Sequence, residues 1–321
     1  MEPVTSWLIE DDNPYIKYLT YKNILGKKID KKGSPEIIDR FASFKAVSSI
    51  LNMQSKKGWW GTDTYSFNPL YKNTFWQLYF LSIMGITRRI SGIDKAVELV
   101  VNHIQKDDGS FPSSSKYSGN LCCMEGISLE MLLRLGYADY DFTKKSINFI
   151  NNLVYRESFR CKYRQNLRCP WGAIKILKAY NLVPEKYVDE KLESTKKKAL
   201  DFLVKYDIVE ANYPRKKDRS NNWFMFGYPR SYNSDILELV TVVVDAGCSK
   251  NSRNVRRALD YILSKRLPDG TWKMEYSLNG RMLVDIEKKN KPSKWVTYFA
   301  LKTLYGSKYL EKKNELQNQQ S

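Results

Sequence analysis

The sequence predicts an all-α protein folded as an α/α toroid, in which about six inner helices are surrounded by five to six outer helices. Apolar segments alternate with amphipathic segments along the chain, and strand patterns are almost absent. Short glycine-aromatic motifs recur about every 50 residues, a length that suits a pair of helices. Such pairs pack on their neighbours, and six of them can close into a ring without exposed ends.

The recurring motif is a glycine followed by an aromatic residue at the end of an amphipathic segment. It reads GWWG at Gly58, GSF at Gly109 and GTW at Gly270, with a weaker copy at Phe159. The long interval before Gly270 predicts a disguised copy near Trp223. Glycine permits a tight, left-handed turn, and the aromatic ring can fill the wedge between two helix pairs. We therefore interpret the motif as structural.

Each predicted helix follows from its apolar pattern and its end signals. Segments that are apolar on nearly all sides should be buried inner helices, and segments with one apolar face should lie outside. Ser34 and Pro35 are a capping residue and a first-turn proline, while Gly136 and Gly247 end inner helices. The predicted inner helices span 15–25, 74–84, 121–135, 171–180, 236–246 and 295–304. The predicted outer helices span 34–53, 93–104, 143–153, 193–206 and 252–263.

Composition favours one cytoplasmic domain over residues 1–310, followed by a polar tail over 311–321 that we expect to be disordered. Hydrophobic residues make up 42% of the chain and aromatic residues 13%. No apolar run approaches the ~20 residues of a membrane span, and the acidic N-terminal segment lacks the pattern of a signal peptide. The 5 cysteines suit free thiols or metal ligands better than a disulfide framework.

The chain is strongly basic, with a formal net charge of +18. Such a balance can serve binding to nucleic acid or to an anionic membrane surface. The lysines are spread along the sequence, however, and no nucleic-acid motif accompanies them. The pattern argues against nucleic-acid binding and leaves open a transient contact with a membrane surface.

Several stretches resemble a known superfamily. They are the DGSFPS and DGTWKMEY turns, CMEG followed by LLRLGY, CPWGAIKIL, FGYPRSYNSDILE and KPSKWVTYFALKTL. The turns resemble the QW-type, or squalene-cyclase, repeats of the terpenoid cyclase and protein prenyltransferase superfamily. The whole chain looks like a small prokaryotic group of prenyltransferase or squalene-cyclase-repeat proteins within it. The resemblance implies an α/α toroid whose central cavity binds or transforms an elongated apolar, isoprenoid-like ligand.

The motifs that carry chemistry in that superfamily are missing. The chain has neither DxDD nor DDxxD, and Cys169 is followed by Pro170 rather than by a histidine. An enzyme of this kind would be a transferase or a cyclase (lyase) of prenyltransferase type, but no activity is assigned. Two alternatives stay open: a non-catalytic toroid scaffold that binds a peptide or protein, and an electrostatic binder of nucleic acid or anionic lipid.

Three cysteines are candidate metal ligands. Cys123 and Cys169 each begin a C-x-x-G stretch at the start of an inner helix, and Cys161 lies in the turn between them. Inner helices of a toroid begin at one end of the ring, so the thiols should converge and could hold zinc, with Asp235 as a possible fourth ligand. The alternative is that these cysteines are small buried hydrophobic residues.

Asp235, Glu238 and Asp285 are the candidate catalytic residues. Asp235 and Glu238 are three residues apart at the start of an apolar helix, where a carboxylate could act as acid, base or ligand. The alternative is a charge at a helix N-terminus paired with Arg230. Near Asp285, Lys294 could neutralise a phosphate at a helix N-terminus, or it could form a structural ion pair.

Aromatic residues on the inner helices are the candidate ligand-binding wall. We expect them to line a pocket at the centre of the toroid. The functional end of the ring should be the one where the inner helices begin, because the connections there carry the candidate cysteines, Asp235, Asp285 and Lys294. The candidates are Trp76, Tyr79, Trp171, Tyr232 and Trp295. A cavity with converging polar groups would favour ligand binding, and a filled centre would favour the scaffold.

Overall fold

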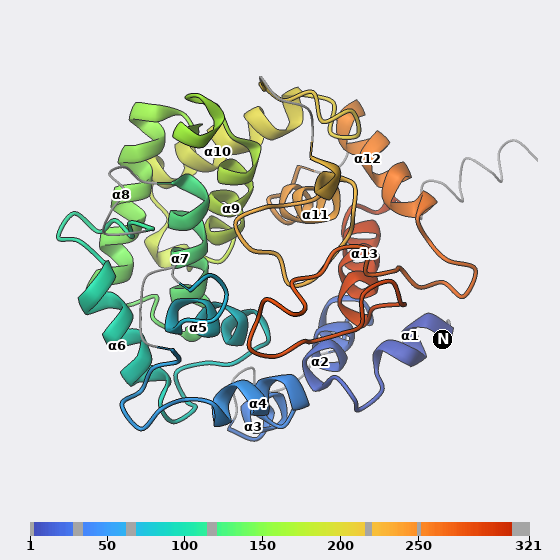
Figure 1. Cartoon of the computed structure of the whole chain (residues 1–321). Helices are drawn as coiled ribbons and strands as arrows, with labels where there is room; N and C mark the ends of the chain where they lie inside the picture. The colour runs from blue at the N-terminus through green and yellow to red at the C-terminus, as the bar shows by residue number, and fades with distance from the viewer. Residues whose placement is uncertain are drawn as a thin grey trace, which may run out of the picture.

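The computed structural model describes residues 3–27, 35–61, 69–113, 121–215, 220–248 and 252–309. The expected tail over 311–321 and the expected capping residue Ser34 lie outside these ranges. The described helices form a ring with an inner and an outer layer (Figure 1), which confirms the predicted α/α toroid.

The inner helices are α2 (Pro14–Asn23), α5 (Thr74–Ile83), α7 (Cys122–Leu135), α9 (Pro170–Tyr180), α11 (Ile236–Asp245) and α13 (Lys294–Gly306). The outer helices are α1 (Pro3–Leu8), α3 (Pro35–Ala42), α4 (Lys45–Asn52), α6 (Ile93–Ile104), α8 (Asp141–Glu157), α10 (Glu190–Lys205) and α12 (Arg253–Ser264). Short 3₁₀ turns are η1 (Lys162–Arg164), η2 (Glu185–Tyr187) and η3 (Asn221–Trp223). Within the described ranges, the strands are β1 (Arg160–Cys161) and β2 (Leu167–Arg168), which pair as a small antiparallel hairpin.

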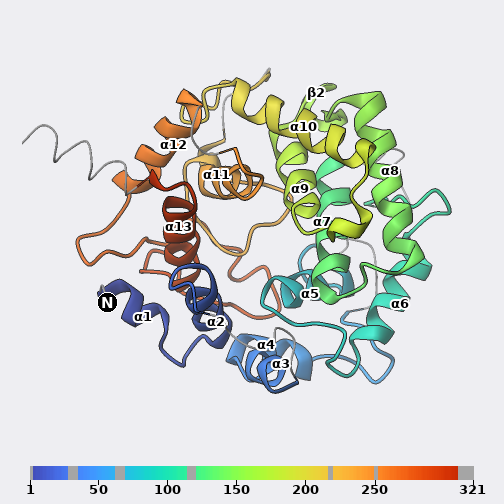
Figure 2. The ribbon, with the colours of Figure 1, turned by 180° about the vertical axis from the view of Figure 1, so that it is seen from behind.

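Glycines let the inner helices α7 and α9 pack backbone to backbone. A Cβ at Gly126 of α7 would lie 2.5 Å from the carbonyl carbon of Lys175, and one at Gly172 of α9 would lie 2.7 Å from the Cβ of Cys122. The start of α9 therefore lies against the start of α7, so the two helices are parallel. The ring closes where α13 packs against α2, as seen from both sides (Figures 1 and 2).

One predicted helix is wrong in its length. The segment expected to be a single outer helix over 34–53 is two helices, α3 and α4, separated at Ser43 and Phe44. The Ser43 hydroxyl donates to the Arg40 carbonyl (2.8 Å), a local bond that competes with helix continuation. Before the break, Phe41 of α3 packs against Tyr15 of α2 with ring centroids 4.9 Å apart.

The glycine-aromatic turns are structural. The indole of Trp60 donates to the Ile50 carbonyl at 2.7 Å, and the indole of Trp272 donates to the Ile262 carbonyl at 2.7 Å. Each tryptophan therefore ties the turn back to the outer helix ten residues earlier. The predicted disguised copy is also present, because buried Trp223 donates from its indole to a backbone carbonyl.

Each of these turns is also fixed to the inner helix that follows it. The backbone N–H groups of Trp60 and Trp272 donate to the hydroxyls of Thr74 and Thr297, at 3.0 and 2.9 Å. At the equivalent place on α7, the N–H of Phe111 donates to the carboxyl oxygens of Glu125 at 3.0 and 3.1 Å. Burial raises the pKa of Glu125 to about 8, against the opposing effect of this hydrogen bond. The carboxyl group is therefore mostly protonated at neutral pH.

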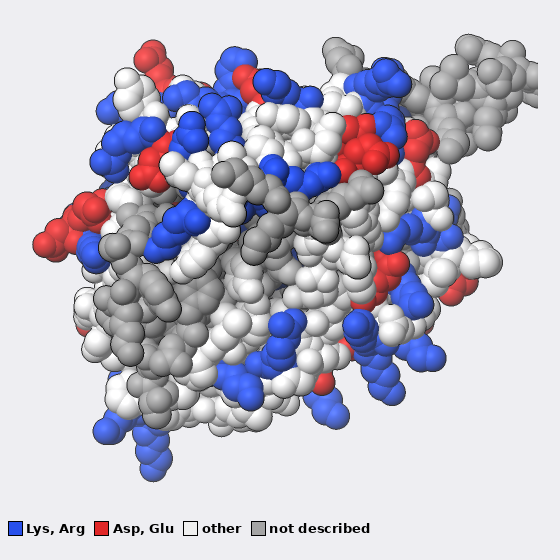
Figure 3. Space-filling view, turned by 45° about the horizontal axis from the view of Figure 1, so that its top comes forward, with Lys and Arg blue, Asp and Glu red and all other residues white. Residues whose placement is uncertain are grey.

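Charged side chains cover the outside without forming one basic stripe. Figure 3 shows Lys and Arg side chains scattered over one face and interspersed with acidic ones. None of the helices described here combines the length and the apolar character that crossing a membrane requires.

We predict that Gly126→Ala lowers the free energy of unfolding by about 2 kcal/mol or more, because the methyl group must push α7 away from α9. Gly306→Ala is the matched control: Gly306 also lies in a helix, and its nearest neighbour is a Val244 side-chain carbon at 3.3 Å. Urea unfolding of both variants measures the difference. Equal stabilities would show that the α7–α9 contact is not tight.

We predict that Glu125→Gln stabilises the protein at pH 8 and has little effect at pH 4. The folded pKa lies above the ordinary value, so the native state favours the neutral carboxyl group. Stability is therefore full below about pH 4.5 and falls until the pH passes about 8, by on the order of a few kcal/mol. Glutamine keeps the acceptor without the charge. Thermal unfolding from pH 4 to pH 9 tests this, and parallel curves for the two proteins would contradict it.

Candidate functional site

A central cavity of about 720 Å³ lies inside the ring. Residues of α2, α3, α5, α7, α9, α11 and α13 line it, together with the segment 227–235 that precedes α11. On α5, α7 and α9 the lining residues come from the C-terminal halves. On α11 and α13 the lining includes Leu237, Glu238 and Val296 from the first turns, so the cavity is not confined to one end of the inner helices.

One wall of the cavity is aromatic and aliphatic. It comes from α2, α3 and α13 and from the segment before α11. Tyr15 stacks near Tyr18 with centroids 6.5 Å apart, and both rings pack against Phe41. Tyr228 stacks on Trp295 at 3.9 Å. The aromatic members of this wall are Tyr15, Tyr18, Phe41, Tyr228, Tyr298 and Phe299.

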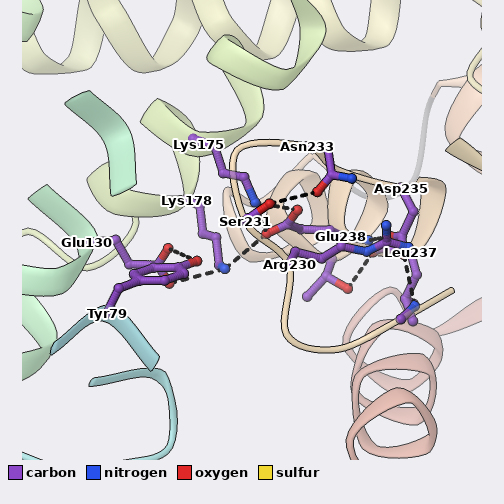
Figure 4. Close-up of polar contacts among 12 residues, drawn as sticks. Tyr79, Glu130, Lys175, Lys178, Arg230, Ser231, Asn233, Asp235, Leu237 and Glu238 are labelled. Atoms are coloured by element: carbon purple, nitrogen blue, oxygen red, sulfur yellow. Dashed lines mark hydrogen bonds and ion pairs between the residues drawn. The ribbon is translucent and has the colours of Figure 1, made fainter. Parts of the chain in front are cut away.

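The facing wall carries a buried network of ion pairs from α7, α9 and α11 (Figure 4). Lys178 lies between two carboxylates, 3.1 Å from Glu130 and 3.0 Å from Glu238. Arg134 extends the network on α7, with its Nε 2.8 Å from Glu130. Lys175 extends it on α9, with its Nζ 2.7 Å from Glu238. The network therefore holds three cations and two anions, and it joins three inner helices.

Mutual attraction offsets the effect of burial on the pKa of most of these groups. Burial alone would raise the pKa of Glu238, but Lys175 and Lys178 lower it to about 2. Glu130 likewise has a lowered pKa, because Lys178 and Arg134 outweigh its burial. Burial lowers the pKa of Lys175 more than Glu238 raises it. For Lys178, by contrast, the two carboxylates overcome burial and raise the pKa.

Asp235 has a structural role at the start of α11. It is the N-cap of the helix, and its side chain accepts from the backbone N–H of Glu238 at 2.7 Å. It also accepts from the guanidinium group of Arg230 and from the N–H of Gly227. Burial raises the pKa of Asp235, against the attraction of Arg230. These contacts agree with the ion-pair alternative left open by the sequence. A catalytic role for Asp235 or Glu238 stays a prediction.

The structure corrects the expected aromatic lining. Of the aromatic candidates, Tyr79 lines the cavity, and Trp76, Trp171, Tyr232 and Trp295 do not. The three tryptophans lie in the first turns of their helices. Trp76 is fully buried, and its ring packs against Phe75 and other aromatic side chains. Trp295 supports the cavity wall indirectly, through its stacking on Tyr228.

Asp285 and Lys294 do not line the cavity either. The buried ammonium group of Lys294 pairs with Glu10 at 2.9 Å and with Asp12. It therefore fastens the segment after α1 to the start of α13, as the structural alternative supposed, although with other partners. Asp285 is exposed and accepts from the N–H of Gly280 at 2.9 Å.

The three candidate thiols lie near the starts of the neighbouring helices α7 and α9. Cys123 is in the first turn of α7, Cys169 is the N-cap residue of α9, and Cys161 lies in the hairpin that precedes α9. Across the described residues, however, no group of three or more His, Cys, Asp and Glu side chains could hold a metal ion. Asp235, the possible fourth ligand, forms an ion pair with Arg230. Zinc stays a prediction that elemental analysis of the purified protein can test.

Sequence reasoning missed the residues that form most of the site. Glu130, Arg134, Lys175 and Lys178 are charged residues inside otherwise apolar helices. Because a buried charge needs a partner, such residues at spacings of three and four signal an internal network. The aromatic members on α2 and α3 gave no comparable signal, since their role depends on the unforeseen break after α3.

No protein-family model matches this sequence, and no curated protein matches it. Among solved structures, it is similar to a possible member of the GH105 family from Salmonella enterica, at 12% identity and a TM-score of 0.48, over 94% of this chain and 83% of the other. It is also similar to the type II terpene cyclase MstE from Scytonema, in a variant complexed with geranylgeranyl dihydroxybenzoate, at 10% identity and a TM-score of 0.30, over 82% of this chain and 94% of the other.

We predict that Glu238→Gln lowers the free energy of unfolding at pH 7 by about 3–5 kcal/mol, because it leaves Lys175 buried without its counter-charge. The carboxylate has a lowered pKa, so its contribution is full above about pH 4.5 and is lost as the pH falls toward 2. The cost of the substitution should shrink over the same range. Urea unfolding at several pH values measures it.

Asp245→Asn is the control for this prediction, because the Asp245–Lys302 pair also lines the cavity but is partly exposed. It should cost less than about 1 kcal/mol. Adding Lys175→Met to Glu238→Gln should recover most of the lost stability. An effect of Glu238→Gln no larger than that of the control would contradict a tightly coupled network.

Proposed function

We propose that this protein binds an elongated, isoprenoid-like apolar molecule in its central cavity, with an anionic end of the ligand at the ion-pair network. The observation that carries the proposal is the contrast between the two walls of one cavity. A ligand with an apolar chain and a charged end would meet the aromatic wall and the cationic wall at the same time. The volume of about 720 Å³ is within the usual range for small-molecule sites.

The charge of the lining favours an anion. Five cationic side chains, Lys22, Arg134, Lys178, Arg230 and Lys302, line the cavity with four carboxylates. Arg134 engages Glu130 through Nε, and its guanidinium group approaches the hydroxyl of Tyr15, where the two walls meet. Guanidinium groups bind carboxylate and phosphate through paired hydrogen bonds. Arg134 is therefore the residue that we assign to the anionic end of the ligand.

The open cavity favours this function over a scaffold with a filled centre. Polar groups converge on it, which was the sequence-based criterion for ligand binding. The ion pairs of Glu238 and Asp235 favour a positioning role over acid or base catalysis. We therefore propose ligand binding and leave the reaction unassigned.

Binding of three probes tests the proposal: farnesol, farnesyl phosphate and inorganic phosphate. We expect farnesyl phosphate to bind about tenfold more tightly than farnesol, which corresponds to about 1.4 kcal/mol, and inorganic phosphate to bind weakly. Arg134→Gln should remove the preference for the phosphate, because a neutral side chain cannot pair with it. Titration calorimetry gives the affinities, and native mass spectrometry of freshly purified protein reports any co-purified ligand.

Two controls separate the cavity from the surface. Leu19→Trp, on the cavity side of α2, should block both isoprenoids, whereas Leu51→Trp, a half-buried position on α4 outside the lining, should not. Arg88→Gln removes a partly exposed arginine outside the cavity lining and should leave the preference intact. Equal binding by wild-type protein and Leu19→Trp would place the ligand elsewhere, and binding of none of the probes would overturn the proposed ligand class.

A further inference from the structure

A basic hairpin lies outside the cavity, in a stretch of the sequence without acidic residues. It consists of β1, η1 and β2, between α8 and α9, and β2 lies at the rim of the molecule beside α8 and α10 (Figure 2). The sequence has no Asp or Glu between Glu157 and Glu185. The cations of the hairpin are Arg160, Lys162, Arg164 and Arg168.

Two of these arginines face each other across the hairpin. Arg160 is paired directly opposite Arg168, and both are exposed. Side chains at opposite positions point to the same face of a ladder, where like charges repel each other. Arg160 donates through Nη1 to the Asn166 carbonyl at 2.9 Å, and the guanidinium group of Arg168 lies 6.0 Å from the centre of the Phe202 ring. Both contacts are with neutral groups, so an anion bound here would relieve the repulsion.

The basic surface continues from the hairpin onto α8 and α10. Phe202 of α10 stacks on Phe159, the residue before β1, with ring centroids 6.0 Å apart. One turn earlier on α10, the exposed Lys198 has its Nζ 5.0 Å from the centre of the Tyr155 ring of α8. Residues four apart on a helix are neighbours. Lys198 therefore extends the line of cations that begins at Arg168.

Two exposed tyrosines lie among these cations. Tyr155 is 78% exposed and Tyr163, in η1 at the tip of the hairpin, is 62% exposed. No other large hydrophobic side chain in the described ranges is as exposed. The Nζ of Lys162 lies 5.5 Å from the centre of the Tyr163 ring. We call this region the hairpin surface, and its members are Tyr155, Arg160, Lys162, Tyr163, Arg168 and Lys198.

We propose that the hairpin surface docks the protein on an anionic membrane, with its cations at the lipid phosphates and its tyrosine rings at the level of the headgroups. Its charge is complementary to such a membrane, where each Lys or Arg near the surface contributes about 1 kcal/mol. Tyrosine favours this interface because one part of its side chain is apolar and the other is polar. The net charge of +18 attracts the whole chain in the same direction. The proposal is independent of the ligand in the cavity.

The shape of the hairpin surface favours a membrane over nucleic acid. Each strand is 2 residues long, which is too short for a ribbon that enters a DNA groove. Proteins that bind single strands use a groove and free aromatic faces on which bases stack. Here a lysine lies over the ring of each tyrosine, and the tip of the hairpin is exposed. An exposed tip at the rim suits a flat anionic surface.

Vesicle flotation of the full-length protein tests the proposal. The probes are vesicles of phosphatidylcholine alone and vesicles that also contain about one third phosphatidylserine. The protein should float with the anionic vesicles and not with the neutral ones, and added salt should weaken binding because it screens the charges. Arg160→Gln combined with Arg168→Gln should weaken binding roughly thirtyfold, which corresponds to about 2 kcal/mol. Tyr163→Ser should weaken it severalfold and leave the salt dependence unchanged.

Lys288→Gln combined with Lys289→Gln is the matched control, because it removes two exposed cations from the segment before α13. It should weaken vesicle binding by less than about threefold. Leu19→Trp, which obstructs the cavity, should bind vesicles as the wild type does, so that docking is separated from uptake of a lipid into the cavity. The Arg160→Gln and Arg168→Gln protein should be at least as stable as the wild type in thermal unfolding, since the substitutions remove a repulsion.

Two outcomes would overturn the membrane site: equal losses in the two double variants, or equal binding to neutral and anionic vesicles. A labelled oligouridine serves as the competing probe. If it binds more tightly than the anionic vesicles, and Arg160→Gln with Arg168→Gln abolishes that binding, the surface belongs to nucleic acid and the proposal is wrong.

Discussion

Lys178 holds the middle of this ring together, and much of the molecule is arranged around its charge. An ammonium group in a helical core is costly unless carboxylates surround it. Here Glu130 of α7 and Glu238 of α11 reach it from both sides, which fixes the rotation of α7, α9 and α11 about their axes. The same pairs form one wall of the cavity. The residues that define the inner wall of the ring are therefore also those that would receive a ligand.

The fold could be predicted because its signals are local. Apolar periodicity places helices, and the turns at Gly58 and Gly270 repeat one set of contacts, such as the indole hydrogen bonds of Trp60 and Trp272 to the outer helices before them. The site could be predicted only in part, because a cavity depends on how the side chains of several helices pack together in three dimensions. Trp76 and Tyr79 are three residues apart on α5, yet the first packs among aromatic rings and the second lines the cavity. That difference depends on depth along the ring axis, which periodicity does not encode.

The same residue types serve different purposes at the two ends of the ring. Where the inner helices begin, Thr74, Glu125 and Thr297 satisfy backbone N–H groups of the turns, and cysteines pack around α7 and α9. Where α5, α7 and α9 finish, side chains face a cavity. Structural contacts therefore occur in both places: backbone hydrogen bonds fix the turns where the inner helices begin, and the ion pairs of Lys178 with Glu130 and Glu238 join the helices beside the cavity.

The contact of α13 with α2 joins segments that are far apart in the chain. Lys294 adds a second tie across the same seam, through Glu10 and Asp12. While the protein is being synthesised, α2 leaves the ribosome long before α13 exists. Tyr15 and Phe41 then lack the neighbours that cover them in the finished ring. The central cavity is therefore completed in the last stage of folding, and a nascent chain halted before α13 would present this aromatic surface to chaperones.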